Sequence, residues 1–191
     1  MKIDSSVLFL KASLENFWTI GSVVPSSSYL AKKMAMPIAS KPKMVVVELG
    51  AGTGAVTRCL LKVLPSDARL FSLELNATLA DRLSRDISDK RLELIVENAC
   101  NLESVLKERE VSKADYIISG LPLGSIQEDG RQEIYRNIHA CLEPGGLYIQ
   151  FQYFMANFIE IKKHFKVCKV AFEWRNFPPA FIYSCRLRSG R

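Results

Sequence analysis

Short apolar runs and longer mixed stretches alternate along most of the chain. The apolar runs are rich in valine, isoleucine, leucine and phenylalanine, which is typical of strands that are buried on both faces. We expect these strands at Met44–Leu49, Arg69–Glu74, Leu92–Glu97, Ala114–Ser119 and Leu147–Gln152. The stretches between them are long enough for helices, at Ala55–Leu64, Asn76–Arg85, Leu102–Glu108 and Gly130–Leu142. The alternation predicts an α/β domain in which helices cover both faces of a parallel sheet.

The last part of the chain has a different pattern. Two more apolar runs, Val167–Phe172 and Phe181–Leu187, are separated by Glu173–Ala180, a segment that contains two prolines. This connection is too short for the crossover helix that parallel strands need, so the last two strands should be antiparallel. The prediction is therefore a seven-stranded, mostly parallel sheet with an antiparallel last strand.

The N-terminal residues predict amphipathic helices before the sheet. Six apolar residues of segment 3–20 share one helical stripe, and charged residues lie beside or opposite it. The stripe consists of Ile3, Val7, Leu10, Leu14, Phe17 and Trp18. Pro25 and the serines that follow it supply a break and an N-cap for a second helix, Tyr29–Met36. We therefore divide the chain into an N-terminal helical segment, 1–40, and a main domain, 41–191.

Composition narrows the partners and the compartment only a little. The 191 residues carry a net charge of +6, which is a mild bias toward anionic partners such as lipid headgroups or nucleic acid. No apolar run is long enough to span a membrane, and the N-terminus lacks the pattern of a secretion signal. The five cysteines lack any C-x-x-C spacing, so we expect buried, reduced thiols in a cytoplasmic protein and no metal site.

A glycine-rich turn follows the first predicted strand and opens a helix. It reads Glu48-Leu49-Gly50-Ala51-Gly52-Thr53-Gly54, and the next strand ends in a second acid, Glu74. Glycines at this edge of a parallel sheet let the backbone approach a ligand closely, and a carboxylate there is suited to both hydroxyls of a ribose. Because Ala55 completes a G-x-G-x-x-A pattern, the turn by itself fits a dinucleotide as well as another nucleoside cofactor.

Three further features separate these cofactors. Glu48 places a carboxylate near the turn, where it would repel a pyrophosphate and suit a cationic amino acid group. The segment Leu142–Gly146 ends a helix with Pro-Gly-Gly just before the fifth strand, and an antiparallel pair closes the sheet. Together with the glycine turn and the acid after the second strand, these features resemble the class I methyltransferases over roughly Met44–Leu187.

The resemblance implies a Rossmann-like fold and S-adenosyl-L-methionine as the cofactor. In that family the glycine turn and the acid after the second strand hold the methionine and ribose parts, and an acid with a small residue meets the adenine. Here the corresponding pair is Asn98-Ala99, and an asparagine amide both accepts and donates hydrogen bonds. The implied cofactor-binding residues are Glu48, Gly50, Ala51, Gly52, Thr53, Gly54, Glu74, Leu75, Asn98, Ala99 and Ser119.

The loop after the fourth strand lies beside the transferred methyl group in this family, so it distinguishes acceptors. Here it reads Ser119-Gly120-Leu121-Pro122-Leu123 and resembles the Asn-Leu-Pro-(Tyr/Phe) loop of ribosomal RNA adenine dimethylases. Gly120 replaces the asparagine that grips the adenine amino group, and Leu123 replaces the aromatic residue on which a flipped base stacks. Enzymes that extrude a base need both contacts. We therefore do not expect nucleic acid as the partner, and RNA adenine N6-methylation is the alternative function.

The same loop is more similar to the Ser-Gly-Leu-Pro loop of bacterial phospholipid N-methyltransferases. Further stretches agree in kind and place, among them Gly21–Ser27, Gln150–Tyr153 and Asn176–Phe181, which extends the resemblance to nearly the whole chain. It implies methylation of phosphatidylethanolamine toward phosphatidylcholine, and peripheral contact with an anionic cytoplasmic membrane face. The N-terminal segment would make this contact or form a lid over the cofactor, and four nearby lysines favour anionic lipid. These lysines are Lys32, Lys33, Lys41 and Lys43, and Lys11 in the N-terminal helix would favour such lipids as well.

The transfer itself requires a small set of positions around the methyl group. The candidate catalytic positions are Ser119, Gly120, Leu121, Pro122 and Tyr153. Backbone carbonyls of the loop would accept a hydrogen bond from the lipid amine. Tyr153 and Tyr29 are candidates for an aromatic wall that tolerates a methylated ammonium group.

Outside this set, the remaining polar residues receive weaker assignments. Arg175 and Arg186 are candidates for holding the lipid phosphate, although a surface role suits either one better. His139 and His164 are expected to be structural. The sequence leaves the oligomeric state and the particular aminolipid open.

Overall fold

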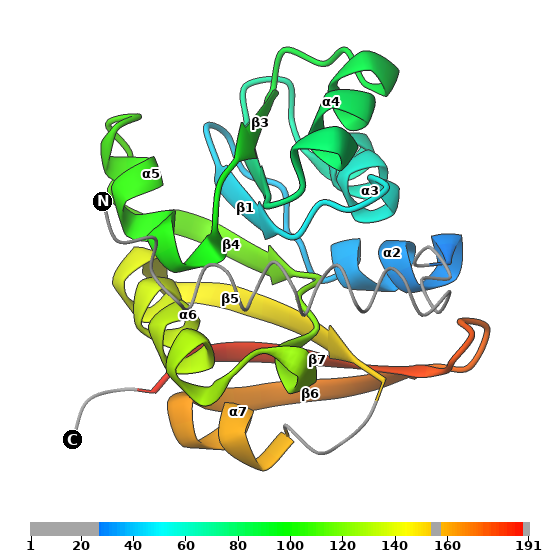
Figure 1. The fold of residues 1–191 in the computed structure, drawn as a ribbon, viewed down its shortest axis with the longest axis vertical. Coiled ribbons are helices and arrows are strands. Elements are labelled where there is room, and N and C mark those ends of the chain that lie inside the picture. The colour runs from blue at the N-terminus through cyan, green and yellow to red at the C-terminus, as the bar shows by residue number, and fades with distance from the viewer. Residues whose placement is uncertain (1–26, 154–157, 189–191) are drawn as a thin grey trace.

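The computed structural model describes residues 27–153 and 158–188, and this part of the chain forms a seven-stranded sheet with helices on both faces (Figure 1). The strands are β1 (Val45–Leu49), β2 (Arg69–Glu74), β3 (Leu92–Val96), β4 (Ala114–Ser119), β5 (Leu142–Gln152), β6 (Phe165–Glu173) and β7 (Ala180–Leu187). The helices are α2 (Ser28–Ala35), α3 (Ala55–Val63), α4 (Ala77–Asp86), α5 (Leu102–Lys107), α6 (Glu128–Cys141) and α7 (Phe158–His164). The α/β architecture expected from the sequence is confirmed. The helix expected at residues 3–20 lies outside the described residues.

The sheet has the order β3-β2-β1-β4-β5-β7-β6, and β1 to β5 run parallel. β7 is antiparallel to both β5 and β6, as the short connection between the last two strands predicts. Leu49 pairs with Leu73 and with Ser119, and Ser119 pairs with Gln150. The strands β1, β2, β4 and β5 therefore end together and form one edge of the sheet, which we call the carboxyl edge.

Alternating side chains of the strands fill two separate cores. Val46 points into a core that α2 and α3 cover, and Val47 points into the opposite core, which α5, α6 and α7 cover. Every residue of β1 after Val45 is buried, as is every residue of β2 after Arg69. Burial on both faces explains why these strands read as continuous apolar runs.

Several element boundaries differ from the sequence-based expectation. A helix was expected at His164 without bounds, and it is α7, a short helix with one fully buried residue, Ile161. β5 begins at Leu142, since Leu142 already pairs with Ala114 before the Pro-Gly-Gly segment shifts the register. α6 begins two residues earlier than expected, at Glu128, because acidic residues stabilise the first turn of a helix.

The cysteines are buried only in part. Cys59, Cys141 and Cys185 are buried and Cys100 is partly buried, but Cys168 is exposed on β6. β6 is the last strand of the sheet, so half of its residues have no covering layer. The expectation of buried thiols is therefore wrong at Cys168.

Helix α2 packs firmly on the sheet, although it precedes the first strand. The side chain of Ser27 caps the helix by accepting from the Leu30 N–H at 3.2 Å. The face that α2 turns toward α3 is fully or almost fully buried, and it consists of Leu30, Ala31, Met34 and Ala35. Within residues 27–153 and 158–188, no helix has both the length and the apolar composition needed to cross a bilayer.

Two methionines at the end of α2 test this packing. Met34 is fully buried, whereas Met36 is 73% exposed. We predict that Met34→Ala lowers the free energy of unfolding by about 2–5 kcal/mol, because it leaves a cavity in the core. Met36→Ala should change it by less than about 0.5 kcal/mol. Urea unfolding followed by circular dichroism measures both, and equal effects would contradict the packing of α2.

Candidate functional site

The glycine turn between β1 and α3 lies at the carboxyl edge. Gly50, Gly52 and Gly54 all have positive φ, at 79°, 54° and 78°, a conformation that other residues rarely adopt. A β-carbon at Gly54 would lie 2.2 Å from Leu83 Cδ1, so α4 also excludes a side chain there. The turn is therefore a backbone surface, held to β2 because the Gly50 N–H donates to the Leu73 carbonyl at 2.8 Å.

Glu74, at the end of β2, is tied to the glycine turn. Its Oε2 accepts from the Gly52 N–H at 2.7 Å, and its Oε1 accepts from the Asn76 N–H at 2.9 Å. The carboxylate is almost fully buried, with 6% of the residue exposed. Each of its oxygens keeps a further lone pair, so it can still accept two hydroxyl donors side by side.

Glu48 is buried beneath the turn, between β1, β2 and α3. Its Oε2 accepts from Ser72 Oγ at 2.6 Å and from Thr57 Oγ1 at 2.7 Å. Its Oε1 is buried and accepts no hydrogen bond from any residue that the structure describes. Burial raises the pKa of Glu48 to about 7, the hydrogen bonds from Ser72 and Thr57 oppose this, and the charge of Glu74 adds to it. The unpaired oxygen leaves room for one more donor.

The loop after β4 packs directly on the glycine turn. The Gly120 N–H donates to the Leu49 carbonyl at 2.8 Å, and a β-carbon at Gly120 would lie 3.1 Å from the Gly50 carbonyl oxygen. Ser119 is fully buried, and its Oγ accepts from the Leu121 N–H at 3.3 Å. The structure thus brings together the two loops that the sequence singled out.

Two glutamines of β5 hold this loop, and the sequence analysis assigned them no such role. Gln150 Nε2 and Gln152 Nε2 both donate to the Leu121 carbonyl, at 3.1 and 3.3 Å. The Tyr148 hydroxyl donates to Gln150 Oε1 at 2.6 Å, and burial raises the pKa of Tyr148 well above its usual value. Polar residues on a buried strand were the available signal. Because the Leu121 carbonyl already accepts twice, it is a poor acceptor for a substrate amine.

The residues expected near an adenine ring lie after β3 on the same edge. Asn98 is buried and caps the 3-10 turn η1 (Ala99–Asn101), because its Oδ1 accepts from the Cys100 N–H at 3.0 Å. This leaves the Asn98 amide nitrogen as a donor. Ala99 is buried, and Leu75 is partly buried against the same core.

The aromatic and basic candidates are separated by the fold. Tyr153 follows β5 at the carboxyl edge, half-buried, with its ring edge-on to Phe151 at 5.5 Å between centroids. The ring of Tyr29 is covered on one face, because the Arg175 guanidinium lies 4.1 Å from its centroid. Arg186 lies near the end of β7, which runs antiparallel, so it is remote from the carboxyl edge. Tyr153 is therefore the better placed of the two tyrosines, and Arg186 is excluded as a ligand at this edge.

The four lysines do not form one cluster. Lys32 and Lys33 lie on α2, and Lys33 Nζ pairs with Glu173 at 3.1 Å. Lys41 and Lys43 precede β1 at the opposite edge of the sheet, where Lys41 pairs with Asp115 at 2.5 Å. The expectation of a single basic patch is wrong, because Lys33 pairs at one edge of the sheet and Lys41 pairs at the other.

The two histidines lie at the edge opposite the glycine turn. His139, near the end of α6, stacks on Phe165 with 4.6 Å between centroids. His164, at the end of α7, stacks on Tyr135 at 4.4 Å. Burial lowers the pKa of both imidazoles. Their packing agrees with the structural role that was expected.

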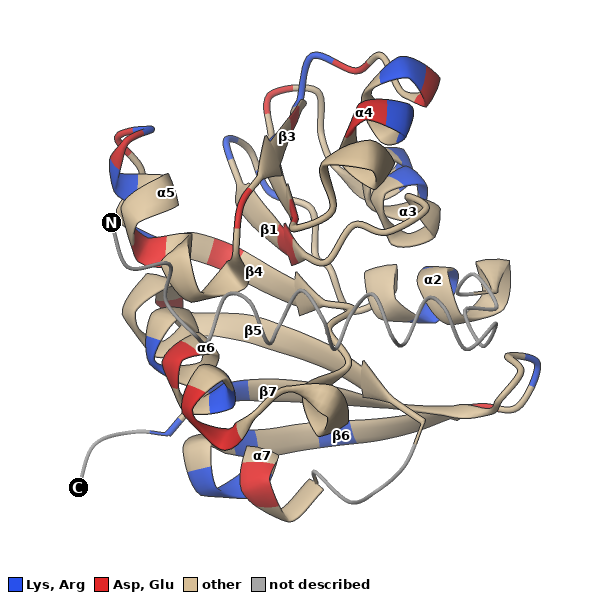
Figure 2. Cartoon of the chain, in the orientation of Figure 1, with Lys and Arg blue, Asp and Glu red and all other residues tan. Residues whose placement is uncertain are grey.

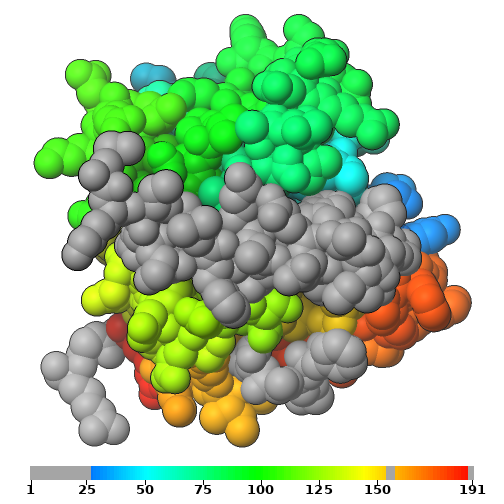
Figure 3. Space-filling model, in the orientation of Figure 1, coloured from blue at the N-terminus to red at the C-terminus, as the bar shows by residue number. Residues whose placement is uncertain are grey.

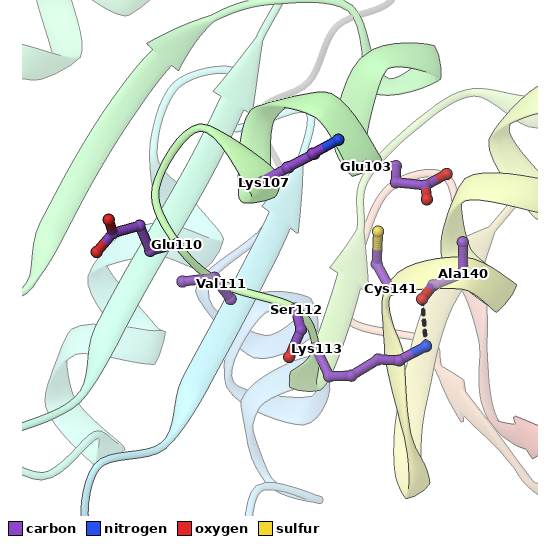
Figure 4. A pocket seen from close by; sticks show the side chains of 8 residues that line it. All are labelled: Glu103, Lys107, Glu110, Val111, Ser112, Lys113, Ala140 and Cys141. Carbon is purple, nitrogen blue, oxygen red and sulfur yellow. Dashed lines mark hydrogen bonds between the residues drawn. The ribbon is translucent and has the colours of Figure 1, made fainter.

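A cavity of about 440 Å³ lies at that same opposite edge (Figure 4). It is lined by residues that precede β4, by α5 and the turn after it, and by the end of α6. Lys113 closes one side by donating from Nζ to the Ala140 carbonyl, which caps the C-terminus of α6. Because β4 separates it from the glycine turn, this cavity is not part of the candidate site.

Several known proteins resemble this chain in sequence. Residues 46–146 match the model of a family described as a methyltransferase domain. The ornithine lipid N-methyltransferase of Singulisphaera acidiphila is 30% identical over 187 residues, which cover 94% of each chain. The ribosomal RNA small subunit methyltransferase A of Thermotoga petrophila is 30% identical over 104 residues, 54% of this chain and 36% of that one.

A solved structure shows the same fold. It is the 1,6-didemethyltoxoflavin-N1-methyltransferase of Burkholderia thailandensis with bound S-adenosylhomocysteine, and the TM-score is 0.71. The similarity covers 97% of this chain and 89% of that one, at 14% sequence identity. At this identity the similarity concerns the fold alone.

The pKa of Glu48 makes stability depend on pH. Since the pKa is raised on folding from 4.5 to about 7, the folded chain binds more protons than the unfolded chain between these values. The free energy of unfolding should therefore fall as pH rises from about 5 to about 8. At about 1.4 kcal/mol per pKa unit, the fall is of the order of 3 kcal/mol. Glu48→Gln should remove this component, and urea unfolding at several pH values measures it. Parallel pH profiles for the two proteins would contradict the raised pKa.

Proposed function

Because this chain belongs to the S-adenosylmethionine-dependent methyltransferases, we propose that it transfers a methyl group from S-adenosylmethionine to the headgroup amine of an aminolipid. The observation that carries the acceptor is the match to an ornithine lipid N-methyltransferase over 94% of both chains. The phosphatidylethanolamine acceptor expected from the sequence has the same reacting group, a primary amine on a lipid headgroup. Phosphatidylethanolamine and ornithine lipid are therefore compared as acceptors in the same methyl-transfer experiment.

The geometry of the loop after β4 supports an acceptor that is not a nucleobase. Gly120 has no side-chain amide to read the edge of a base, and a β-carbon there would be in tight contact with the Gly50 carbonyl oxygen, at 3.1 Å. Leu123 is fully buried and presents no ring for stacking. The match to a ribosomal RNA methyltransferase covers only 54% of the chain, which favours RNA less than the lipid.

The residues at the carboxyl edge fit S-adenosylmethionine. We propose that the backbone of Gly50, Ala51, Gly52, Thr53 and Gly54 surrounds its methionine part, where positive φ keeps side chains away. The unpaired Oε1 of Glu48 makes the turn electronegative, which suits a cationic amino acid group and a sulfonium.

The nucleoside part is assigned to the neighbouring loops. Glu74 would accept from both ribose hydroxyls, and Leu75 would pack on the adenine ring. The amide nitrogen of Asn98 would donate to the adenine edge, with Ala99 beside it. Ser119, buried at the end of β4, would position the loop close to the methyl group.

The cofactor supplies a methyl group that is already activated by its sulfonium, so the chain mainly has to orient the amine for attack. The neutral amine attacks the methyl group. The product is a methylated ammonium group, which can then lose a proton to solvent. The described loop contains no acid, and its Leu121 carbonyl is fully used by Gln150 and Gln152. We therefore place the amine near the Gly120 carbonyl, with Pro122 shaping the entrance. A desolvated position there lowers the pKa of the ammonium group and favours the free base.

Tyr153 is the proposed aromatic wall for the methylated ammonium group. It lies directly after β5, and its ring is held edge-on to Phe151. Burial raises the pKa of Tyr153, and the Asn176 side chain beside its hydroxyl opposes part of this rise. A cation over the face of a tyrosine gains about 0.5–2 kcal/mol, which offsets part of the lost hydration.

The acceptor requires contact with a bilayer. We propose that the protein lies peripherally on the cytoplasmic face of an anionic membrane and that residues 1–40 contribute to this contact or cover the cofactor. Lys32 is exposed on α2, which supports attraction to anionic headgroups.

Glu74 provides a direct test of cofactor binding. Glu74→Gln should weaken the affinity for S-adenosylmethionine by about 10- to 100-fold, because a hydrogen bond to a charged group contributes about 1.5–3 kcal/mol. Asp81→Asn, which removes the same charge from the exposed face of α4, should leave the affinity unchanged. Titration calorimetry measures both, and equal affinities for the two variants would exclude Glu74 from the site.

Transfer of a radiolabelled methyl group tests the acceptor. The purified protein is offered vesicles with phosphatidylethanolamine, vesicles with ornithine lipid, or ribosomal RNA. We expect label in one or both lipids and none in RNA. Gly120→Ala should reduce transfer by about tenfold or more, since its methyl group meets the backbone carbonyl of Gly50 at the site, whereas the methyl group of Gly130→Ala in α6 meets a side-chain methyl of Ile126 away from it. Label in RNA and not in the vesicles would overturn the proposal.

A further inference from the structure

The turn between β6 and β7 reverses the usual distribution of side chains. Trp174 and Phe177 are 71% and 76% exposed, although they are large and apolar. Glu173 and Asn176, which are polar, are buried in the same turn, at 0% and 2% exposed. A buried polar group together with an exposed apolar surface is an informative exception in a folded protein. We call residues 174–179 the hairpin tip.

The buried polar side chains hold the hairpin tip rigidly against α2. Glu173 accepts from Arg175 at 2.9 Å and pairs with Lys33 of α2 at 3.1 Å. Asn176 accepts from the Ser27 N–H at 2.8 Å and donates to the Pro178 carbonyl at 2.7 Å. The orange surface of the turn accordingly lies beside the blue surface of α2 in the space-filling view (Figure 3). The two aromatic side chains are exposed on a well-built turn.

The hairpin tip and α2 are basic. Neither α2 nor residues 174–179 contain an aspartate or glutamate, while Lys32, Lys33 and Arg175 are all present. The adjoining carboxylate of Glu173 is buried and paired twice. Blue positions on the turn and on α2 show this distribution (Figure 2). A positive surface that also exposes tryptophan and phenylalanine suits the headgroup region of an anionic bilayer.

The hairpin tip lies at the same edge of the sheet as the candidate site. β7 starts there, because Gln152 at the end of β5 pairs with Phe181. The tip also adjoins the site, since the Asn176 side chain lies beside the Tyr153 hydroxyl. A surface seated on the tip would therefore face the entrance of the site.

We propose that the hairpin tip is a membrane-docking wedge, with Trp174 and Phe177 inserted at the boundary between headgroups and acyl chains. Lys32 and Arg175 lie among the anionic headgroups around it. The lipid amine then reaches Tyr153 while its acyl chains stay in the bilayer. This inference builds on the proposed lipid acceptor, and the experiments below separate the two.

Fluorescence quenching tests the insertion directly. The chain has two tryptophans, so Trp18→Phe leaves Trp174 as the single emitter. The probe is a vesicle of phosphatidylcholine and phosphatidylglycerol with brominated acyl chains, which contains no acceptor amine. We expect quenching of Trp174 in these vesicles and quenching by iodide when vesicles are absent. An unquenched Trp174 in vesicle-bound protein would overturn the proposal, as would protection from iodide in solution, which would show that residues 1–26 or a second copy cover the tip.

Sedimentation with the same lipids, without bromine, measures how much the tip contributes. The double variant Trp174→Ser/Phe177→Ser should bind these vesicles about tenfold less tightly or weaker, because two aromatic side chains no longer leave water. A matched variant, Val63→Ser/Ile159→Ser, removes exposed apolar residues elsewhere and should bind as the unmodified chain does. Equal binding by the two double variants would overturn the proposal. Thermal unfolding confirms that both remain folded.

Methyl transfer to an aminolipid separates this inference from the proposed function. The tip variant should lose activity on vesicles but keep it when the same lipid is dispersed in detergent micelles. If the tip variant methylates vesicles at the unmodified rate, the docking wedge is wrong and the lipid acceptor stands. If the unmodified chain methylates no lipid in either form while Trp174 is still quenched, the acceptor is wrong and the wedge stands.

Discussion

Everything at the carboxyl edge depends on one close approach between two stretches of backbone. The Gly50 carbonyl and Gly120 lie so near each other that a single added carbon would be at 3.1 Å. This contact joins the turn after β1 to the loop after β4, so backbone groups of the two segments lie next to each other. A small cofactor can then be held by backbone groups, and the acceptor can come within reach of the methyl group. Gln150 and Gln152 fix the far side of the loop through the Leu121 carbonyl.

The same edge contains a buried carboxyl group, Glu48, whose ionised form is unfavourable. Glu48 is buried with one oxygen unpaired, and its raised pKa shows that the ionised form is costly in the folded chain. Ser72 and Thr57 compensate only the other oxygen. Perturbed carboxyl groups of this kind gather at functional sites, because a ligand can supply the missing partner. A cationic ligand above the glycine turn would supply it here.

The sequence predicted those parts of the protein that local pattern determines. The succession of strands and helices along the chain, the glycine turn and the acid at Glu74 depend on neighbouring residues. They are found where they were expected. Features that depend on pairing between distant segments escaped it. Gln150 and Gln152 are one example. Their partner, the Leu121 carbonyl, comes within reach only because β4 pairs with β5. The lysines at 32, 33, 41 and 43 are close in sequence, yet they lie at different edges of the sheet. Lys33 pairs with Glu173 at the carboxyl edge, and Lys41 pairs with Asp115 near the start of β4. The exposure of Trp174 and Phe177 beside the buried Glu173 and Asn176 likewise appears only in the folded chain.

A lipid amine and a water-soluble cofactor have to meet although they come from different phases. The lipid and the cofactor must therefore bind at the same edge of the fold. A rigid sheet cannot bring together ligands that are bound at opposite edges. In this chain the antiparallel β7 provides the solution. A parallel last strand would begin at the opposite edge, whereas β7 begins at the carboxyl edge, so the turn that precedes it lies beside Tyr153 and α2. The departure from a purely parallel sheet thus brings an aromatic, basic surface to the edge at which we propose that the methyl group is transferred.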